Sequence, residues 1–220
     1  QAVFFDYDHD GDLDMFLLNH SNHTYNPFLN TRKTRATPNF NFGNRLFRQD
    51  RDANGRIHFT DVTLPAGIVS NALNCGLSGT VSDVNGDGWP DIYTTSDYTA
   101  RACFSINNHD GTFTQSLEKS FPHISKYSMG SDIADYNNDE RPDVLTLDML
   151  PEDNHRQQIL KGPDEYDQYH QLIDSGYYHQ QMRNMLQLNE GMDETGTLRF
   201  SEIGQLAGVS NTDWSWSALF

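Results

Sequence analysis

A short acidic motif occurs three times in the chain and constrains the fold more than any other feature. It reads DYDHDGDLD at 6–14, DVNGDGWPD at 83–91 and DYNNDERPD at 135–143. Each copy has Asp or Asn at places one, three and five and Asp at place nine. Crowded carboxylates repel one another unless a cation neutralises them. A single copy is compatible with a solvated acidic turn, but three matching copies predict loops that wrap a hard cation.

The ligand chemistry indicates which cation. Oxygens at places one, three, five and nine, with a backbone carbonyl at place seven, suit the six to eight oxygen ligands of Ca²⁺. No Cys lies in the motif, which disfavours zinc and copper. The predicted ligands, copy by copy, are Asp6, Asp8, Asp10, Asp12 and Asp14; Asp83, Asn85, Asp87, Trp89 and Asp91; and Asp135, Asn137, Asp139, Arg141 and Asp143.

Place six distinguishes the third copy from the other two. Gly11 and Gly88 occupy this place in the first two copies, where a tight loop needs a backbone that tolerates positive φ. Glu140 occupies it in the third copy. That loop must therefore adopt a strained turn or shift its position. We expect the third site to bind calcium most weakly.

The residues around each motif predict β-strands rather than the helices of an EF-hand. An EF-hand loop closes with Glu at place twelve, whereas Leu17 stands there in the first copy. Strand-like runs follow the motifs as DMFLLN, DIYTTS and DVLTLDM, and others precede them as AVFFD, LSGTVSD and GSDIAD. A third and a fourth strand follow in each repeat. Gly55, Gly111 and Gly196 mark the hairpin turns between them.

Four antiparallel strands for each acidic loop predict an all-β fold of β-propeller blades. We assign blade 1 to 1–70, blade 2 to 71–123, blade 3 to 124–208 and the first strand of a fourth blade to 212–220. Three blades cannot close a ring, and open sheet edges promote aggregation. We therefore expect the chain to be part of a larger propeller, whose remaining blades are its structural partners; the resemblance described next implies seven blades in all.

The repeat resembles the FG-GAP/VCBS repeats of integrin-α-type calcium propellers. Longer phrases, namely SMGSDIADYNND, DMLPEDN and TDWSWSALF, are similar to bacterial VCBS-repeat proteins that often carry an ASPIC/UnbV domain and to cartilage acidic proteins. The resemblance covers nearly the whole chain. It implies a secreted or surface-exposed propeller that binds Ca²⁺ between the first two strands of a blade and has a binding role. Glu140 departs from the glycine of this family, and these 220 residues contain no ASPIC/UnbV segment.

Two long insertions interrupt the repeat, at roughly 20–43 and 150–183. Both fall between the second and third strands of a blade. Because strand direction alternates, the acidic loops should lie on one face of the blades and both insertions on the other.

The second insertion is predicted to be helical. Pro151 suits a first helical turn, Gly162-Pro163 interrupts the helix, and Gly176 can end it. Its tyrosines either anchor a partner or pack the insertion onto the propeller. These candidate partner-binding residues are Tyr166, Tyr169, Tyr177 and Tyr178.

Composition narrows the class of partner. The chain carries 31 Asp and Glu against 15 Lys and Arg, for a formal net charge of −16. No basic stripe is present, which excludes nucleic acid as a partner, and the acidity disfavours an anionic membrane surface. No apolar run approaches the roughly 20 residues of a membrane span, so membrane insertion is not expected. Cys75 and Cys103 can be bonded or free.

These features predict a non-catalytic, calcium-binding module that presents its insertion loops to a protein or glycan partner. We expect it to be extracellular, at the cell surface or periplasmic. The alternative is part of a calcium-dependent propeller enzyme, a lyase or hydrolase acting on polysaccharide. A lyase needs a base and cationic groups that converge in a cleft, but the Lys and Arg residues are scattered along the sequence.

Overall fold

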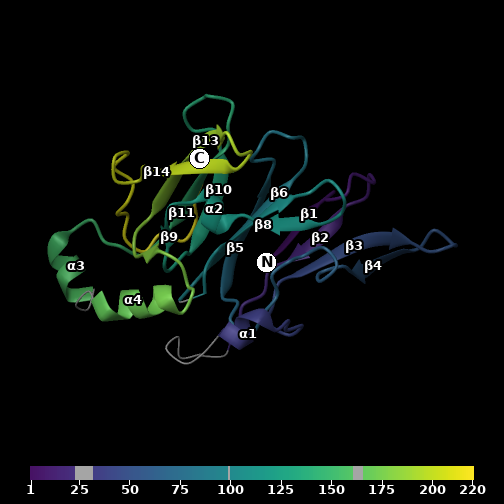
Figure 1. Cartoon of the computed structure of the whole chain (residues 1–220), viewed down its shortest axis with the longest axis horizontal. Helices are drawn as coiled ribbons and strands as arrows, with labels where there is room; N and C mark the ends of the chain where they lie inside the picture. The colour runs from purple at the N-terminus through teal and green to yellow at the C-terminus, as the bar shows by residue number, and fades with distance from the viewer. Residues whose placement is uncertain (23–31, 99, 161–165) are drawn as a thin grey trace.

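The computed structural model describes residues 1–22, 32–98, 100–160 and 166–220 and contains three four-stranded antiparallel sheets (Figure 1). The first sheet has the order β1 (Ala2–Phe5), β2 (Asp14–Leu17), β3 (Arg45–Arg51) and β4 (Ile57–Asp61). The second has β5 (Gly76–Ser82), β6 (Asp91–Ser96), β7 (Cys103–Asn107) and β8 (Phe113–Gln115). The third has β10 (Gly130–Ala134), β11 (Asp143–Leu147), β13 (Met185–Met192) and β14 (Leu198–Glu202). The predicted all-β fold is confirmed.

The register of the first two strands is the same in all three sheets. The residue before place one of the motif pairs with the aspartate at place nine: Phe5 with Asp14, Ser82 with Asp91 and Ala134 with Asp143. Each acidic motif is therefore the turn of a β-hairpin, and place nine is the first residue of the second strand.

The innermost strands of the three sheets lie side by side. Gln1, just before β1, exchanges hydrogen bonds with Gly79 of β5, and its Oε1 accepts from the Gly79 amide at 2.9 Å. Between β5 and β10, the hydroxyls of Thr80 and Ser131 lie 2.9 Å apart. At the opposite edge of the first sheet, β4 is exposed along its whole length. This radial arrangement is that of propeller blades.

The apolar core lies between neighbouring sheets. One cluster, which includes Phe16, Leu46 and Ile92, packs the first sheet on the second. A second cluster packs the second sheet on the third, and the rings of Phe121 and Phe200 stack there with centroids 4.5 Å apart. The second sheet thus buries both faces, and the first and third sheets each bury one face against it.

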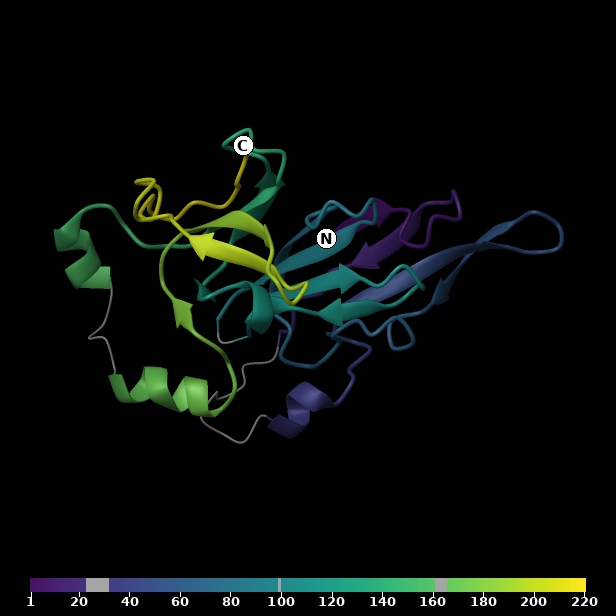
Figure 2. The same cartoon turned by 45° about the horizontal axis from the view of Figure 1, so that its top comes forward.

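Both insertions lie between the second and third strands of their sheets, as predicted. The first contains α1 (Arg32–Ala36), and the second contains α3 (Asn154–Leu160), α4 (Tyr166–Asp174) and β12 (Gln180–Gln181). β12 pairs in parallel with β9 (Ile124–Ser125), which ties the insertion to the start of its own repeat. Figure 2 shows α1 and α4 on the side of the sheets opposite the β10–β11 connection. The faces inferred from strand direction are therefore correct.

The helices differ from the prediction in detail. The first begins at Asn154 rather than at Pro151, because the Asp153 carboxylate accepts a hydrogen bond from the Arg156 amide and so caps the helix one turn later. Gly176, with φ +80°, ends α4 as predicted. The predicted break at Gly162-Pro163 lies outside the described residues. A further short helix, α2 (Leu117–Ser120), follows β8 and was not predicted.

The predicted first strand of a fourth blade, 212–220, is not formed as a strand. The segment nevertheless lies along β10: a Cβ on Gly130 would meet the Trp216 carbonyl oxygen at 2.6 Å, and the Phe220 amide donates to Asp132. It thus lies beside β10, as β10 lies beside β5. An inner strand is held in its sheet by the strand that follows it, and within the described ranges no segment pairs with 212–220 in that way.

The structure also describes the two cysteines and the character of the helices. Cys75 and Cys103 are both free, and burial raises the pKa of the Cys75 thiol to about 11. Among the helices in the described ranges, none is long and apolar enough to cross a membrane.

Candidate functional site

The place-one aspartate organises each acidic loop. Its two carboxylate oxygens accept hydrogen bonds from the backbone amides of places five and six. In the first loop Asp6 accepts from Asp10 and Gly11. Asp83 and Asp135 repeat these contacts in the other loops. The bonds bend the chain around this carboxylate.

The place-nine aspartate is fully buried in every copy. Asp14, Asp91 and Asp143 each have 0% exposure. One oxygen accepts from the amide at place two, as Asp14 does from Tyr7 at 3.1 Å, and the other accepts from the third strand of the same sheet, as Asp14 does from Gln49 at 2.8 Å. Place nine therefore connects the loop to the rest of its sheet.

All three loops share one backbone conformation. Place six is left-handed not only in Gly11 (φ +89°) and Gly88 (φ +87°) but also in Glu140 (φ +68°). Of the two outcomes expected for the third copy, the structure shows the strained turn. Place four is left-handed as well, in His9 and Asn138, a requirement that the sequence alone did not reveal.

The place-five carboxylate has a different partner in each of the last two loops. Asp87 Oδ2 lies 2.8 Å from His109 Nε2, and Asp139 Oδ2 accepts from the Arg141 guanidinium at 2.8 Å. In the third loop a fixed positive charge thus already satisfies one of the predicted ligands. This contact, besides the strain at Glu140, disfavours cation binding there.

The first loop has the most complete set of cation ligands. Carboxylate oxygens of Asp6, Asp8 and Asp14 lie within 4.8 Å of one another. Asp8 Oδ1 is buried and lacks a hydrogen-bond partner. An unsatisfied buried carboxylate oxygen is costly in free energy, and a bound cation would remove this cost. The residues present therefore fit a hard divalent ion.

Burial raises the pKa of the place-nine aspartate in all three loops. Burial, followed by the neighbouring charges of Asp8 and Asp10, raises the pKa of Asp14 to about 6, although amides of Gln49 and Tyr7 act in the opposite direction. Burial likewise raises the pKa of Asp91 to about 7. A cation at the loop centre reverses this balance, because it favours the ionised carboxylates.

Two asparagines, Asn107 and Asn189, link the first and second loops to the sheet that follows each of them; we call them the inter-sheet asparagines. The amide group of Asn107 donates to the place-two carbonyl of Tyr7, in the preceding sheet, and to Pro90 in its own sheet. Asn189 repeats this arrangement with the carbonyls of Val84 and Pro142. Their backbone amides also donate to the place-nine carboxylates. The loops are therefore joined through the packed sheets.

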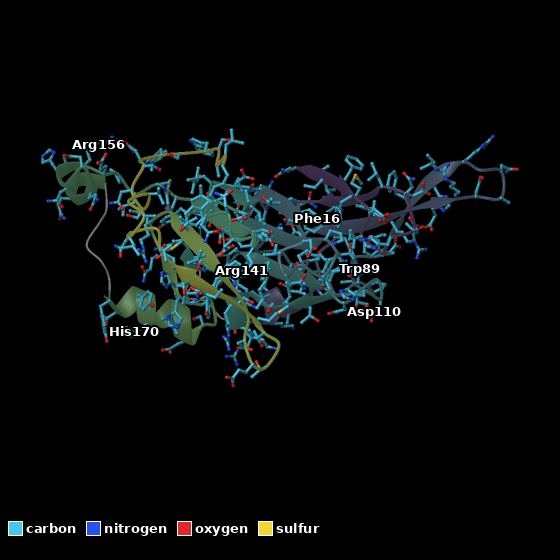
Figure 3. All side chains as sticks on the ribbon, turned by 90° about the horizontal axis from the view of Figure 1, so that it is seen from above. Phe16, Trp89, Asp110, Arg141, Arg156 and His170 are labelled. Atoms are coloured by element: carbon cyan, nitrogen blue, oxygen red, sulfur yellow. The ribbon has the colours of Figure 1, made fainter. Side chains whose placement is uncertain are left out.

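Aromatic rings join the first two loops on their exposed side. The ring of Trp89, at place seven of the second loop, stacks on His9 of the first loop at 4.0 Å and on His109 at 5.0 Å. Figure 3 shows Trp89 and Asp110 toward one end of the molecule and His170, on α4, toward the other. Sequence reasoning assigned only the Trp89 carbonyl to this site and missed the stack.

The four candidate tyrosines differ in exposure. Tyr166 is 74% exposed, whereas Tyr177 is 1% exposed. The hydroxyl of Tyr178 donates to the Phe121 carbonyl at 2.6 Å, and that of Tyr169 lies 2.8 Å from His179 Nδ1. For Tyr177 and Tyr178 the structure favours the packing alternative. Tyr166 and Tyr169 stay candidates for contact with a partner.

Comparison with known families agrees with this geometry. The family model of the FG-GAP-like repeat matches residues 83–146. The matched range begins at place one of the second motif and ends within β11, so it contains two of the three acidic loops. No curated protein matches the chain as a relative. The chain thus contains an FG-GAP-like repeat.

Proposed function

We propose that the chain is part of a calcium-stabilised, non-catalytic binding module of the ASPIC/UnbV-associated VCBS type. The observation that carries the proposal is the separation of the two ends of the sheets. Three carboxylate loops lie at one end, and both insertions lie at the other. In this arrangement calcium rigidifies the sheets, and the insertions contact the partner. The paired carboxylates belong to the loops, which leaves them no role as catalytic acid and base.

Each loop would hold Ca²⁺ through side-chain oxygens at places one, three, five and nine and a carbonyl at place seven. The ion neutralises the crowded carboxylates, and through place nine it stabilises the contact between the first two strands and the third. Extracellular modules bind calcium with dissociation constants of about 10⁻⁴–10⁻³ M. Exposed loops of this kind are filled where calcium is abundant, which supports a location outside the cytoplasm.

Calcium titration of the chain by calorimetry tests the metal part of the proposal. We expect binding to the first two loops and weaker binding to the third. Asp91→Asn should abolish binding to the second loop, because it removes a buried ligand charge. Asp110→Asn, a carboxylate in the neighbouring hairpin outside the motif, is the matched control and should bind like the wild type. Absence of binding to the wild type would refute the proposal.

The partner, a protein or a glycan, is proposed to contact α4 through Tyr166 and Tyr169. Exposed aromatic side chains provide large contact area at low entropic cost. In a screen against glycans and cell-surface proteins, Tyr166→Ala should reduce binding of the identified partner without lowering the melting temperature. Tyr177→Ala should instead lower the melting temperature, because this ring is buried.

A further inference from the structure

A cavity of about 540 Å³ opens on the insertion side of the sheets. Residues of α1 and the turn after α4 contribute to its wall, so both insertions take part. The remaining wall comes from the connections that follow β4, β6 and β8. Cavities of roughly 300–1,000 Å³ are typical of small-molecule sites.

Positive charge gathers around this cavity although the chain as a whole is strongly acidic. Four of the 15 Lys and Arg residues line it: Arg32, Arg35, Arg101 and Lys119. Glu118 is the only acidic residue among the described residues of the wall, and it is paired with Arg101. The four cations come from three separate segments of the sequence, so no cluster is visible before the chain is folded.

Arg35 connects the two insertions at the wall of the cavity. Its guanidinium donates to the carbonyls of Ser175 and Gly176 and lies 4.5 Å from the centroid of the Tyr177 ring. These contacts join the first insertion to the second. Burial, together with the like charges of Arg101 and Arg32, lowers the pKa of Arg35, although Tyr177 acts in the opposite direction. The cations are thus close enough to repel one another.

The rest of the wall is largely apolar. Small and aliphatic side chains form most of it, namely Ala36, Val69, Leu73, Ala100, Ala102 and Leu117, and the amides of Asn71, Asn74 and Gln115 are its polar part. A ligand that fits must therefore offer an anionic group to the arginines and lysine and an apolar body to this wall. Such a ligand also relieves the repulsion among the cations.

We propose that this cavity binds an organic carboxylate whose charged group contacts Arg32, Arg101 and Lys119 and whose apolar body lies against the aliphatic wall. The carboxylate can belong to a free organic acid or to an acidic residue of a partner protein. The site deepens the proposed binding role, because it names the chemistry recognised on the insertion side. It does not depend on calcium binding.

The test uses two pairs of probes that differ only in charge. One pair is 3-phenylpropionate and its neutral amide, and the other is acetyl-Phe-Asp-amide and acetyl-Phe-Asn-amide. Binding to the chain is followed by ligand-observed NMR titration, once in calcium and once in EDTA. We expect at least one acid to bind and its amide partner to bind about tenfold more weakly, since a charge-assisted hydrogen bond is lost. Tighter binding of the peptide acid assigns the site to a protein partner, and tighter binding of the free acid assigns it to a metabolite.

Variants locate the binding. Arg101→Gln and Lys119→Gln should each weaken binding of the acid about tenfold with no change in melting temperature. Arg56→Gln, which removes an exposed arginine of the β3–β4 hairpin, should bind the acid like the wild type. The proposal is overturned if no acid binds, if acid and amide bind equally, or if Arg56→Gln weakens binding as much as Arg101→Gln. If calorimetry shows no calcium binding while the acid still binds, the calcium proposal is refuted and the carboxylate site is retained.

Discussion

The hydrogen bonds of the inter-sheet asparagines allow the loss of stability on their removal to be predicted. Asn189 is 1% exposed, and its side-chain amide makes three hydrogen bonds: it donates to Val84 and Pro142 and accepts from Gly191. One of these bonds reaches the loop of the preceding sheet. Asn189→Ala removes all three and leaves the Val84 carbonyl buried without this donor.

The magnitude follows from the number of bonds. A hydrogen bond contributes about 1 kcal/mol net, so Asn189→Ala should lower the free energy of unfolding by about 3 kcal/mol. For a chain of this length, that corresponds to a melting temperature about 6–12 °C lower. Asn189→Asp should be at least as harmful at neutral pH, because a carboxylate would then face two carbonyl oxygens.

Urea denaturation in EDTA, with circular dichroism as the readout, measures this loss without any contribution from calcium. Asn54→Ala is the control, because Asn54 is exposed in the β3–β4 hairpin and should tolerate the change. A loss below about 1 kcal/mol for Asn189→Ala, or an equal loss for Asn54→Ala, would show that the asparagine does not link the sheets as we argue.

Three further predictions concern the loops and the third sheet. Calcium at a hundredfold excess over its dissociation constant should stabilise the fold by about 2.7 kcal/mol per site; equal melting temperatures in calcium and EDTA would contradict this. Glu140→Gly should raise the free energy of unfolding by about 1 kcal/mol in EDTA, because it removes left-handed strain from a residue with a Cβ, whereas Gly11→Ala should lower it. Burial raises the pKa of Glu202, but hydrogen bonds from His123 and the Gly204 amide and the charge of Arg183 outweigh it, so the net pKa lies below 4.5. The resulting stability is present above pH 4.5 and is lost as the pH falls through the lower folded pKa. In urea titrations across this range, Glu202→Gln should remove that part of the pH dependence, and a curve parallel to the wild type would refute the assignment.

The sequence was sufficient for the geometry of the loops because that geometry is local. Nine consecutive residues contain the acidic side chains, the left-handed place six and the start of the second strand. The side on which the insertions lie, opposite the acidic loops, was also predictable, because strand direction follows from counting the strands in each repeat. The left-handed conformation at place four was not predicted, because the residues there, His9, Gly86 and Asn138, share no side-chain chemistry.

Contacts between sheets were not predictable in the same way. Asn107 lies 16 residues after Asp91, whereas Asn189 lies 46 residues after Asp143, because the second insertion intervenes. Because these spacings differ, the sequence did not indicate that the two asparagines occupy equivalent positions in their sheets. The cationic cavity was not predicted for a similar reason. Arg35 and Gly176 are 141 residues apart and come into contact only because the two insertions pack together.

Both inter-sheet asparagines bind loops that precede them in the chain, which has a consequence for synthesis on the ribosome. Asn107 reaches back 100 residues to Tyr7, and Asn189 reaches back 105 residues to Val84. The first two acidic loops therefore emerge from the ribosome well before the asparagines that bind them. At about 5–20 residues per second, the delay is roughly 5–20 s. In the later part of that interval, after its fourth strand has emerged, a newly made sheet still lacks its final neighbour, and its apolar face is available to chaperones or to other nascent chains.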